Sequence, residues 1–230
     1  KKRNTKVAEN CCVKILSIEP NHFDSIFMLA TLSAIKNDYE KAKKLLHKAI
    51  KIQPKNASAY NNLGTAYKEL GDLKKAIEYY EKALKINSQH TNANYNLGAV
   101  FYKLRDLDKA KHYLKKTVQI QNNYALAYFT LANLHVDLKE LDNAVSCYQK
   151  AIEINPNLLG AHNNLGLVYR QLNDFKNAVI CYEKAIQIKP NHAGAYHNLA
   201  LAFKELGNFE KAIKNHEMAI KYEPERLINY

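Results

Sequence analysis

The sequence of 230 residues has no tryptophan, only two methionines, five prolines and seven glycines. With 47% hydrophobic and 24% charged residues, this composition fits a soluble helical protein. It contains no glycine-rich phosphate loop and no nucleophile elbow. The histidines are scattered, without cysteine or carboxylate at ligand spacing. We therefore predict that this segment has no catalytic residue, no metal site and no cofactor, and that it is not an enzyme by itself.

Long apolar runs are also missing. The longest are far shorter than the roughly 20 residues that span a bilayer, so we expect no membrane insertion. The start of the chain lacks the combination of a basic segment followed by an apolar segment that marks a secretion signal. None of the four cysteines belongs to a CxxC motif, which favours a reducing, cytoplasmic location.

The main feature of the sequence is a repeat of 34 residues. Residues 57–90 read ASAYNNLGTAYKELGDLKKAIEYYEKALKINSQH, and near-copies of this stretch follow one another without a gap. Six whole repeats fill residues 23–56, 57–90, 91–124, 125–158, 159–192 and 193–226. Residues 1–22 match the second helix of a truncated repeat, and residues 227–230 match the start of a following helix or a tail. Because the chain opens in mid-repeat, we expect it to be a fragment of a longer protein.

Each repeat is predicted to form two helices. In residues 57–90, small or apolar residues fall at positions 3, 4, 7, 8, 10, 11 and 14, and again at 17, 20, 21, 24, 27, 28 and 30. Each set makes one stripe of a helix. Gly71-Asp72 between them suits a left-handed residue followed by a helix cap. Two repeats fit this turn chemistry less well, with Arg105-Asp106 and Lys139-Glu140.

Three further positions of the repeat carry characteristic residues. Proline at position 32 should end the second helix, and Ser88 and Asn122, which replace it in two repeats, should weaken that stop. Position 20 is alanine in all seven copies, and position 8 is alanine or glycine. Such small residues predict that the two helices of a pair approach closely. A bulky residue at position 20 should therefore cost about 1–3 kcal/mol.

This pattern resembles the tetratricopeptide repeat (TPR), with a large residue at 4, Leu-Gly/Ala at 7–8, Tyr/Phe at 11, Ala at 20, an aromatic at 24, Ala at 27 and Pro at 32. The resemblance covers essentially the whole chain. It implies an all-α fold, an α-solenoid in which antiparallel helix pairs stack into a right-handed superhelix. It also implies a concave groove, lined mainly by first helices, that holds a peptide or protein segment.

The repeat at 23–56 departs most from this pattern. Ile26 and Ser33 replace the aromatics at positions 4 and 11, and Lys36 stands at position 14. We expect this repeat either to pack less tightly than the others or to border a different upstream domain.

Asparagine recurs at position 6, which should lie at the edge of the groove. An asparagine amide can pair with both the N–H and the C=O of an extended peptide. The series is similar to the asparagine ladder in the repeat arm of O-linked N-acetylglucosamine transferase, although Met28 and Thr130 break it. The alternative is that these side chains brace neighbouring helices. The series comprises Asn62, Asn96, Thr130, Asn164 and Asn198.

The other predicted groove residues stand at positions 5, 9 and 12, opposite the apolar stripe of the first helix. The surface they form is polar, partly aromatic and mildly basic. They do not satisfy the pattern by which related repeats clamp a terminal carboxylate. They are Asn61, Tyr95, Phe129, Asn163 and His197 at position 5, Thr65 and Asn133 at position 9, and Lys68, Tyr102, Arg170 and Lys204 at position 12.

The net charge of +12 is uneven, with 12 Lys/Arg against 5 Asp/Glu in residues 1–56 and 22 against 17 in the rest. This bias favours acidic partners or nucleic acid. Most lysines fall on the outer face of second helices, however, which favours a solvated surface and argues against nucleic-acid binding.

Three hypotheses for function follow from the sequence. The first is a non-catalytic scaffold that binds an extended peptide or protein segment in its groove. The second is the substrate-recruiting arm of a larger, glycosyltransferase-like or other modifying enzyme. The third is self-association into a homo-oligomer through uncapped solenoid ends.

Overall fold

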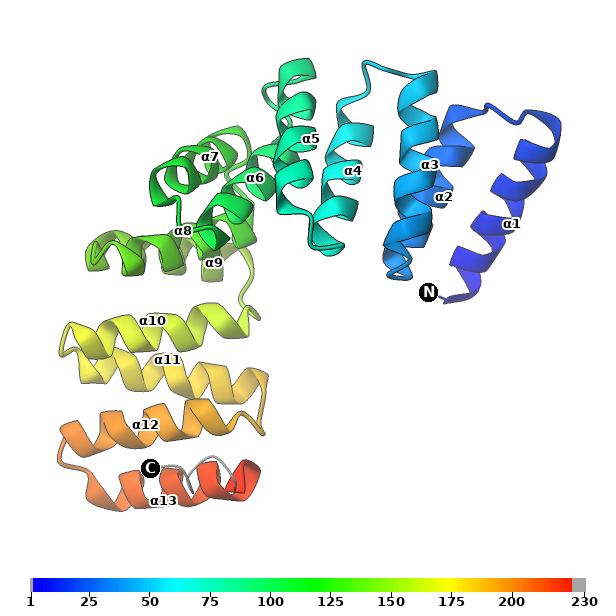
Figure 1. Ribbon diagram of the computed structural model, residues 1–230. Helices are drawn as coiled ribbons and strands as arrows, with labels where there is room; N and C mark the ends of the chain where they lie inside the picture. Colours follow the sequence, from blue (N-terminus) through cyan, green and yellow to red (C-terminus); the bar gives the residue numbers. More distant parts are fainter. Residues whose placement is uncertain (1, 225–230) are drawn as a thin grey trace. The chain divides into compact units, whose positions relative to one another are not determined.

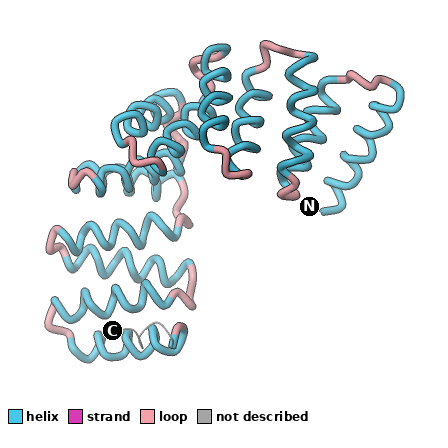
Figure 2. The backbone as a smooth tube through the Cα atoms, viewed as in Figure 1, coloured by secondary structure: helices cyan, strands magenta, loops and turns pink. Residues whose placement is uncertain are grey.

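The computed structural model describes residues 2–224, and these form thirteen α-helices and no strand (Figures 1 and 2). The four residues predicted as a following helix or tail, 227–230, lie outside the described part. The helices are α1 (Lys2–Ile18), α2 (Phe23–Ile35), α3 (Tyr39–Ile52), α4 (Ala57–Glu69), α5 (Leu73–Ile86), α6 (Thr91–Lys103), α7 (Leu107–Ile120), α8 (Ala125–Asp137), α9 (Leu141–Ile154), α10 (Leu159–Gln171), α11 (Phe175–Ile188), α12 (Ala193–Glu205) and α13 (Phe209–Tyr222).

The chain divides into two compact parts, here called the N-terminal half (Lys1–Ile120) and the C-terminal half (Gln121–Tyr230). In the N-terminal half, α2 pairs with α3, α4 with α5 and α6 with α7, and each second helix also packs on the next first helix. The C-terminal half repeats this with the pairs α8–α9, α10–α11 and α12–α13. The predicted all-α stack of helix pairs is therefore confirmed within each half.

The turn inside each pair uses one left-handed residue, whatever its type. Gly71 and Gly207 have φ of 87° and 73°, and Arg105 and Lys139 have φ of 64° and 59°. A non-glycine residue in this left-handed conformation costs on the order of 1–2 kcal/mol of conformational free energy. The less suitable sequences at Arg105 and Lys139 thus adopt the same turn, because packing of the two helices fixes its geometry.

The second helix ends at the same repeat position with or without proline. Helix α5 ends at Ile86 and is followed by Ser88 at position 32, whereas α9 ends at Ile154 ahead of Pro156. The stop lies two residues before position 32, and in α5 the Asn87 side chain accepts a hydrogen bond from the N–H of Gln89 at 3.0 Å. Replacement of the proline therefore leaves the helix end where it is.

Small residues do bring the two helices of a pair into close contact, as predicted. The alanines at position 20 of the six whole repeats are all buried. A Cβ added to Gly166 would lie 2.6 Å from Cε1 of Tyr182 on the second helix, too close for any real contact. The tyrosine rings at position 24 fill the space that these small residues leave.

Helix α6 begins with a histidine cap that depends on pH. The Nδ1 atom of His90 accepts a hydrogen bond from the N–H of Ala93 at 3.2 Å, so only the neutral ring can form this cap. Burial lowers the pKa of His90 from its ordinary value of 6.5. The stability from this group is therefore present above pH 6.5 and is lost as the pH falls below it.

We expect His90→Asn to reduce the loss of stability between pH 7.5 and pH 5 by about 1 kcal/mol, the usual value of an N-cap. Asn56 already caps α4 in this way, with its side chain accepting from the N–H of Ala59 at 3.0 Å. Urea unfolding at both pH values measures the effect. Some pH dependence should persist, because burial and nearby lysines also lower the pKa of His47. An unchanged pH profile in the variant would contradict the cap.

Candidate interaction site: an amide network on the first helices

The sixteen predicted groove residues all lie on the first helices of five pairs, α4, α6, α8, α10 and α12. Most of their side chains are half-buried, so they lie at the edge of the core with part of their surface in solvent. Two differ from the rest: Asn61 is 5% exposed and Lys204 is fully on the surface.

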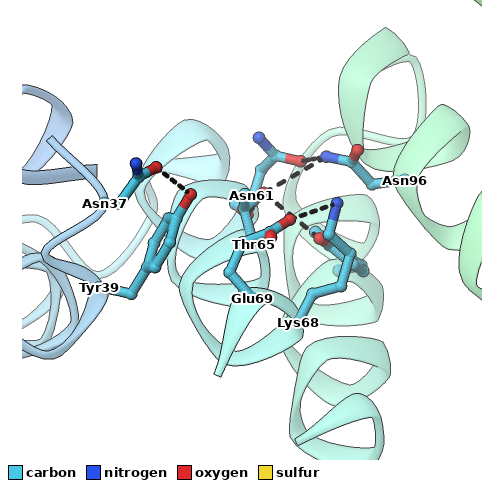
Figure 3. A network of polar contacts seen from close by, with 8 residues as sticks. Asn37, Tyr39, Asn61, Thr65, Lys68, Glu69 and Asn96 are labelled. Carbon is cyan, nitrogen blue, oxygen red and sulfur yellow. Dashed lines mark hydrogen bonds and ion pairs between the residues drawn. The ribbon is translucent and has the colours of Figure 1, made fainter. Parts of the chain in front are cut away.

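In the N-terminal half, asparagine side chains of successive repeats bond to one another (Figure 3). The Nδ2 of Asn96 donates to Oδ1 of Asn61 at 3.0 Å and reaches Oγ1 of Thr65 at 3.5 Å. The Nδ2 of Asn61 in turn donates to Oδ1 of Asn62 at 3.1 Å. These bonds join α4 to α6, one repeat further along the chain.

Thr65 connects this network to the core of its own repeat. Its hydroxyl donates to the backbone carbonyl of Asn61 at 3.1 Å and lies 3.3 Å from the hydroxyl of Tyr80. Burial raises the pKa of Tyr80 to about 12, so its phenol stays protonated at physiological pH. Next to Thr65, the ammonium of Lys68 lies 2.9 Å from Oε1 of Glu69 (Figure 3).

The C-terminal half has a longer version of the same network. The Nδ2 of Asn198 donates to Oδ1 of Asn163 at 3.4 Å, and the Nδ2 of Asn163 donates to Oδ1 of Asn164 at 3.4 Å. The Nδ2 of Asn164 donates to Oδ1 of Asn133 at 3.0 Å. The hydroxyl of Tyr148 donates to the same Oδ1 of Asn133. One continuous chain of amides thus joins α8, α10 and α12.

Three asparagines at position 6, Asn96, Asn164 and Asn198, bond to the preceding repeat, as in the bracing role inferred from the sequence, whereas Asn62 bonds only to Asn61 of its own helix. Bracing does not use all of their hydrogen-bonding capacity. Within the described residues, Nδ2 of Asn62, Oδ1 of Asn96 and Oδ1 of Asn198 have no hydrogen-bond partner. We call these three atoms, with the bonded amides beside them, the amide network.

The predicted aromatic residues are partly held by their own repeats. The ring of Phe129 lies 6.0 Å from that of Tyr148, and its edge would meet a Cβ on Gly160 at 3.1 Å. The rings of His197 and His216 lie 5.3 Å apart. The hydroxyl of Thr130 donates to the backbone carbonyl of Leu126 in its own helix at 2.8 Å. The remaining predicted residues, Tyr95, Tyr102 and Arg170, are half-buried.

Sequence reasoning missed a cavity in the repeat at 23–56, lined in part by Ala34, Ile35 and Leu46. The signal was present at position 13, where Ile35 is apolar. The other whole repeats carry a polar or charged residue there: Glu69, Lys103, Asp137, Gln171 and Glu205. The expectation that this repeat packs less tightly or borders an upstream domain stays a prediction.

Residues 2–224 contain neither a candidate metal site nor a candidate membrane-spanning helix. No group of three or more His, Cys, Asp or Glu side chains in this range is placed to hold a metal ion. None of the helices described there is both long and apolar enough to cross a membrane.

Comparison with family models identifies the repeats. Tetratricopeptide repeat models match residues 57–90, 91–124 and 193–226, and a TPR repeat model matches residues 34–71, 132–172 and 166–207. The chain belongs to the tetratricopeptide repeat family. A search of curated protein sequences gives no significant match.

Solved structures of TPR proteins are similar to the chain. A crystal structure of MamA is 30% identical, covers 73% of this chain and 98% of its own, and has a TM-score of 0.67. YrrB, described as a TPR protein with an unusual peptide-binding site, is 24% identical over 80% of this chain and 94% of its own, with a TM-score of 0.71. The pilF protein of Pseudomonas aeruginosa is 20% identical over 88% of this chain and 92% of its own, with a TM-score of 0.79. The last two likenesses concern the fold alone.

Proposed function

We propose that this chain is a protein-interaction scaffold whose first helices hold an extended peptide or protein segment. The observation that carries the proposal is the amide network, in which the side chains of Asn62, Asn96 and Asn198 each keep one polar atom without a partner. A bound peptide backbone has an N–H and a C=O at every residue and matches such atoms without regard to its sequence.

The hydrogen bonds between these asparagines favour peptide binding. Each asparagine is held in one orientation by a neighbour, so its remaining donor or acceptor is already fixed before a ligand arrives. The similarity of the position-6 asparagines to the ladder of O-linked N-acetylglucosamine transferase supports the same role.

The test begins with peptides selected from a random library displayed on phage, whose affinity for the chain is measured by calorimetry. Replacing Asn62 and Asn96 of the N-terminal half together by alanine should weaken binding about thirtyfold, since each hydrogen bond contributes about 1 kcal/mol. Replacing Lys82, Lys115 and Lys214 on second helices by alanine should leave affinity unchanged.

A second variant separates bracing from ligand contact. In Asn96→Asp the bracing donor is lost but an oxygen acceptor stays, whereas Asn96→Ala removes both. If Asn96 contacts the ligand through Oδ1, the alanine variant should bind about fivefold more weakly than the aspartate variant. Equal affinities in these two variants, or full affinity in the double alanine variant, would refute the proposal.

A further inference from the structure

A cavity of about 280 Å³ opens among α2, α3 and α4 in the N-terminal half. One side is mainly apolar, formed by Ala30, Ala34 and Ile35 of α2 with Leu46 of α3, and the side chains of Thr31 and Tyr39 also line it. The side formed by α4 is polar. It carries Asn62, Thr65 and Glu69, which belong to or border the amide network.

The cavity exists because this repeat has small residues where other repeats have large ones. Position 24 is Leu46 here but tyrosine in three other repeats, and position 12 is Ala34 here but Lys68 in the next repeat. The apolar surface continues outside the cavity, since Ile35 is 65% exposed and Met28, at position 6, is 46% exposed. Both positions are polar in every other whole repeat.

Asn62 differs from the other asparagines at position 6. Asn96, Asn164 and Asn198 each donate their Nδ2 to a side chain at position 5 or 9 of the preceding repeat. The preceding repeat offers Asn62 only Phe27 and Thr31 at those positions. Its Nδ2 has no acceptor within the described residues, and its side chain lines the cavity.

We propose that this cavity binds an amphipathic aromatic side chain, tryptophan or tyrosine, of the peptide held by the scaffold, while Nδ2 of Asn62 donates to a backbone carbonyl of the same residue. This inference rests on the proposed function and names the anchor residue of the ligand.

Size and polarity select this occupant. An apolar cavity of about 150 Å³ is large enough for benzene, whereas pockets for drug-sized ligands hold about 300–1,000 Å³. The cavity therefore suits one large side chain rather than a cofactor. Its apolar wall on α2 and α3 matches an aromatic ring, and the carboxylate of Glu69 on the opposite wall is an acceptor for an indole N–H or a phenol O–H.

Charge selects the residues that flank the anchor. The N-terminal half holds 23 Lys/Arg against 11 Asp/Glu, a net charge of +12, whereas residues 121–230 hold 11 of each. The whole net charge of the chain therefore lies in the half that contains the cavity. An aromatic residue flanked by aspartate or glutamate fits this field better than one flanked by lysine.

The first experiment uses N-acetyl-L-tryptophanamide, which has the ring and a backbone carbonyl. It should shift the methyl NMR signals of Ile35 and Leu46 saturably, with a dissociation constant in the millimolar range, and should bind at least fivefold more tightly than N-acetyl-L-leucinamide. Tighter binding of the leucine compound, or no shift of these methyls, would overturn the proposal.

Variants copied from neighbouring repeats locate the site. Leu46→Tyr fills the cavity and should abolish binding, and it should fold because Ala132 and Tyr148 form the same pair in another repeat. The matched control Leu114→Tyr places the same residue at position 24 of the repeat at 91–124 and should leave binding unchanged. Asn62→Asp keeps the acceptor used by Asn61 but removes the donor, so it should weaken binding at least threefold.

The charge preference is tested with blocked peptides that carry tryptophan between two aspartates or two lysines on each side. The acidic peptide should bind at least tenfold more tightly in 50 mM salt, and the difference should shrink in 0.5 M salt. Equal binding would overturn the preference for acidic flanks.

The two proposals fail separately. If tryptophanamide binds nowhere near Ile35 while library peptides still depend on Asn62 and Asn96, only the anchor site is wrong. If Leu46→Tyr abolishes tryptophanamide binding while no library peptide depends on the asparagines, only the peptide scaffold is wrong.

Discussion

Replacing Tyr182 by alanine is expected to lower the free energy of unfolding by about 3–5 kcal/mol, the usual cost of deleting a buried aromatic ring. The Tyr182 side chain is fully buried between α10 and α11 and lies against Gly166. Deleting it leaves a cavity that these two close-packed helices are poorly able to fill. Urea unfolding followed by circular dichroism measures the change.

Removing only the tyrosine hydroxyl should have different effects on stability at Tyr182 and at Tyr148. The hydroxyl of Tyr182 is buried without a hydrogen-bond partner in the described structure, and burial raises its pKa to about 12. The hydroxyl of Tyr148, at the same repeat position, donates to Asn133. Tyr182→Phe should therefore not lower stability, whereas Tyr148→Phe should lower it by about 0.5–1.5 kcal/mol. Equal losses in the two phenylalanine variants would contradict the assigned partners.

Replacing Ala144 by leucine should cost about 1–3 kcal/mol through overpacking. Ala144 stands at position 20 of its repeat, has no exposed surface and packs in a core cluster with Ala132, Tyr148 and Ala151. Ser146→Leu on the exposed face of the same helix is the control, and it should change stability by less than about 0.5 kcal/mol. If both leucines were tolerated equally, the close approach at position 20 would not be limiting.

Much of the fold was predictable because one packing solution recurs. A first helix begins at Phe23 and again at Ala57, at the first position of each repeat, since the same residues face the same neighbours in every copy. Turn chemistry was a weaker guide. Arg105 and Lys139 adopt the left-handed turn against their own preference, because the packed helices on both sides determine it.

The candidate interaction site was harder to predict from the sequence than the fold. Position 6 singles out Asn96, but its hydrogen-bond partner Asn61 is 35 residues away in sequence, and no local pattern shows which amide bonds to which. The cavity depends on Ala34, Leu46 and Asn62 together. Each of these is an ordinary residue alone, and only their placement around one space gives them a shared role.

The amide chain through Asn163 has a consequence for how the repeats communicate. Asn163 accepts from Asn198 in the following repeat and donates to Asn164, which bonds to Asn133 in the preceding one. Rotation of this single side chain breaks two links at once. The side-chain orientations of Asn198, Asn163 and Asn164 are therefore coupled across three successive repeats by hydrogen bonds.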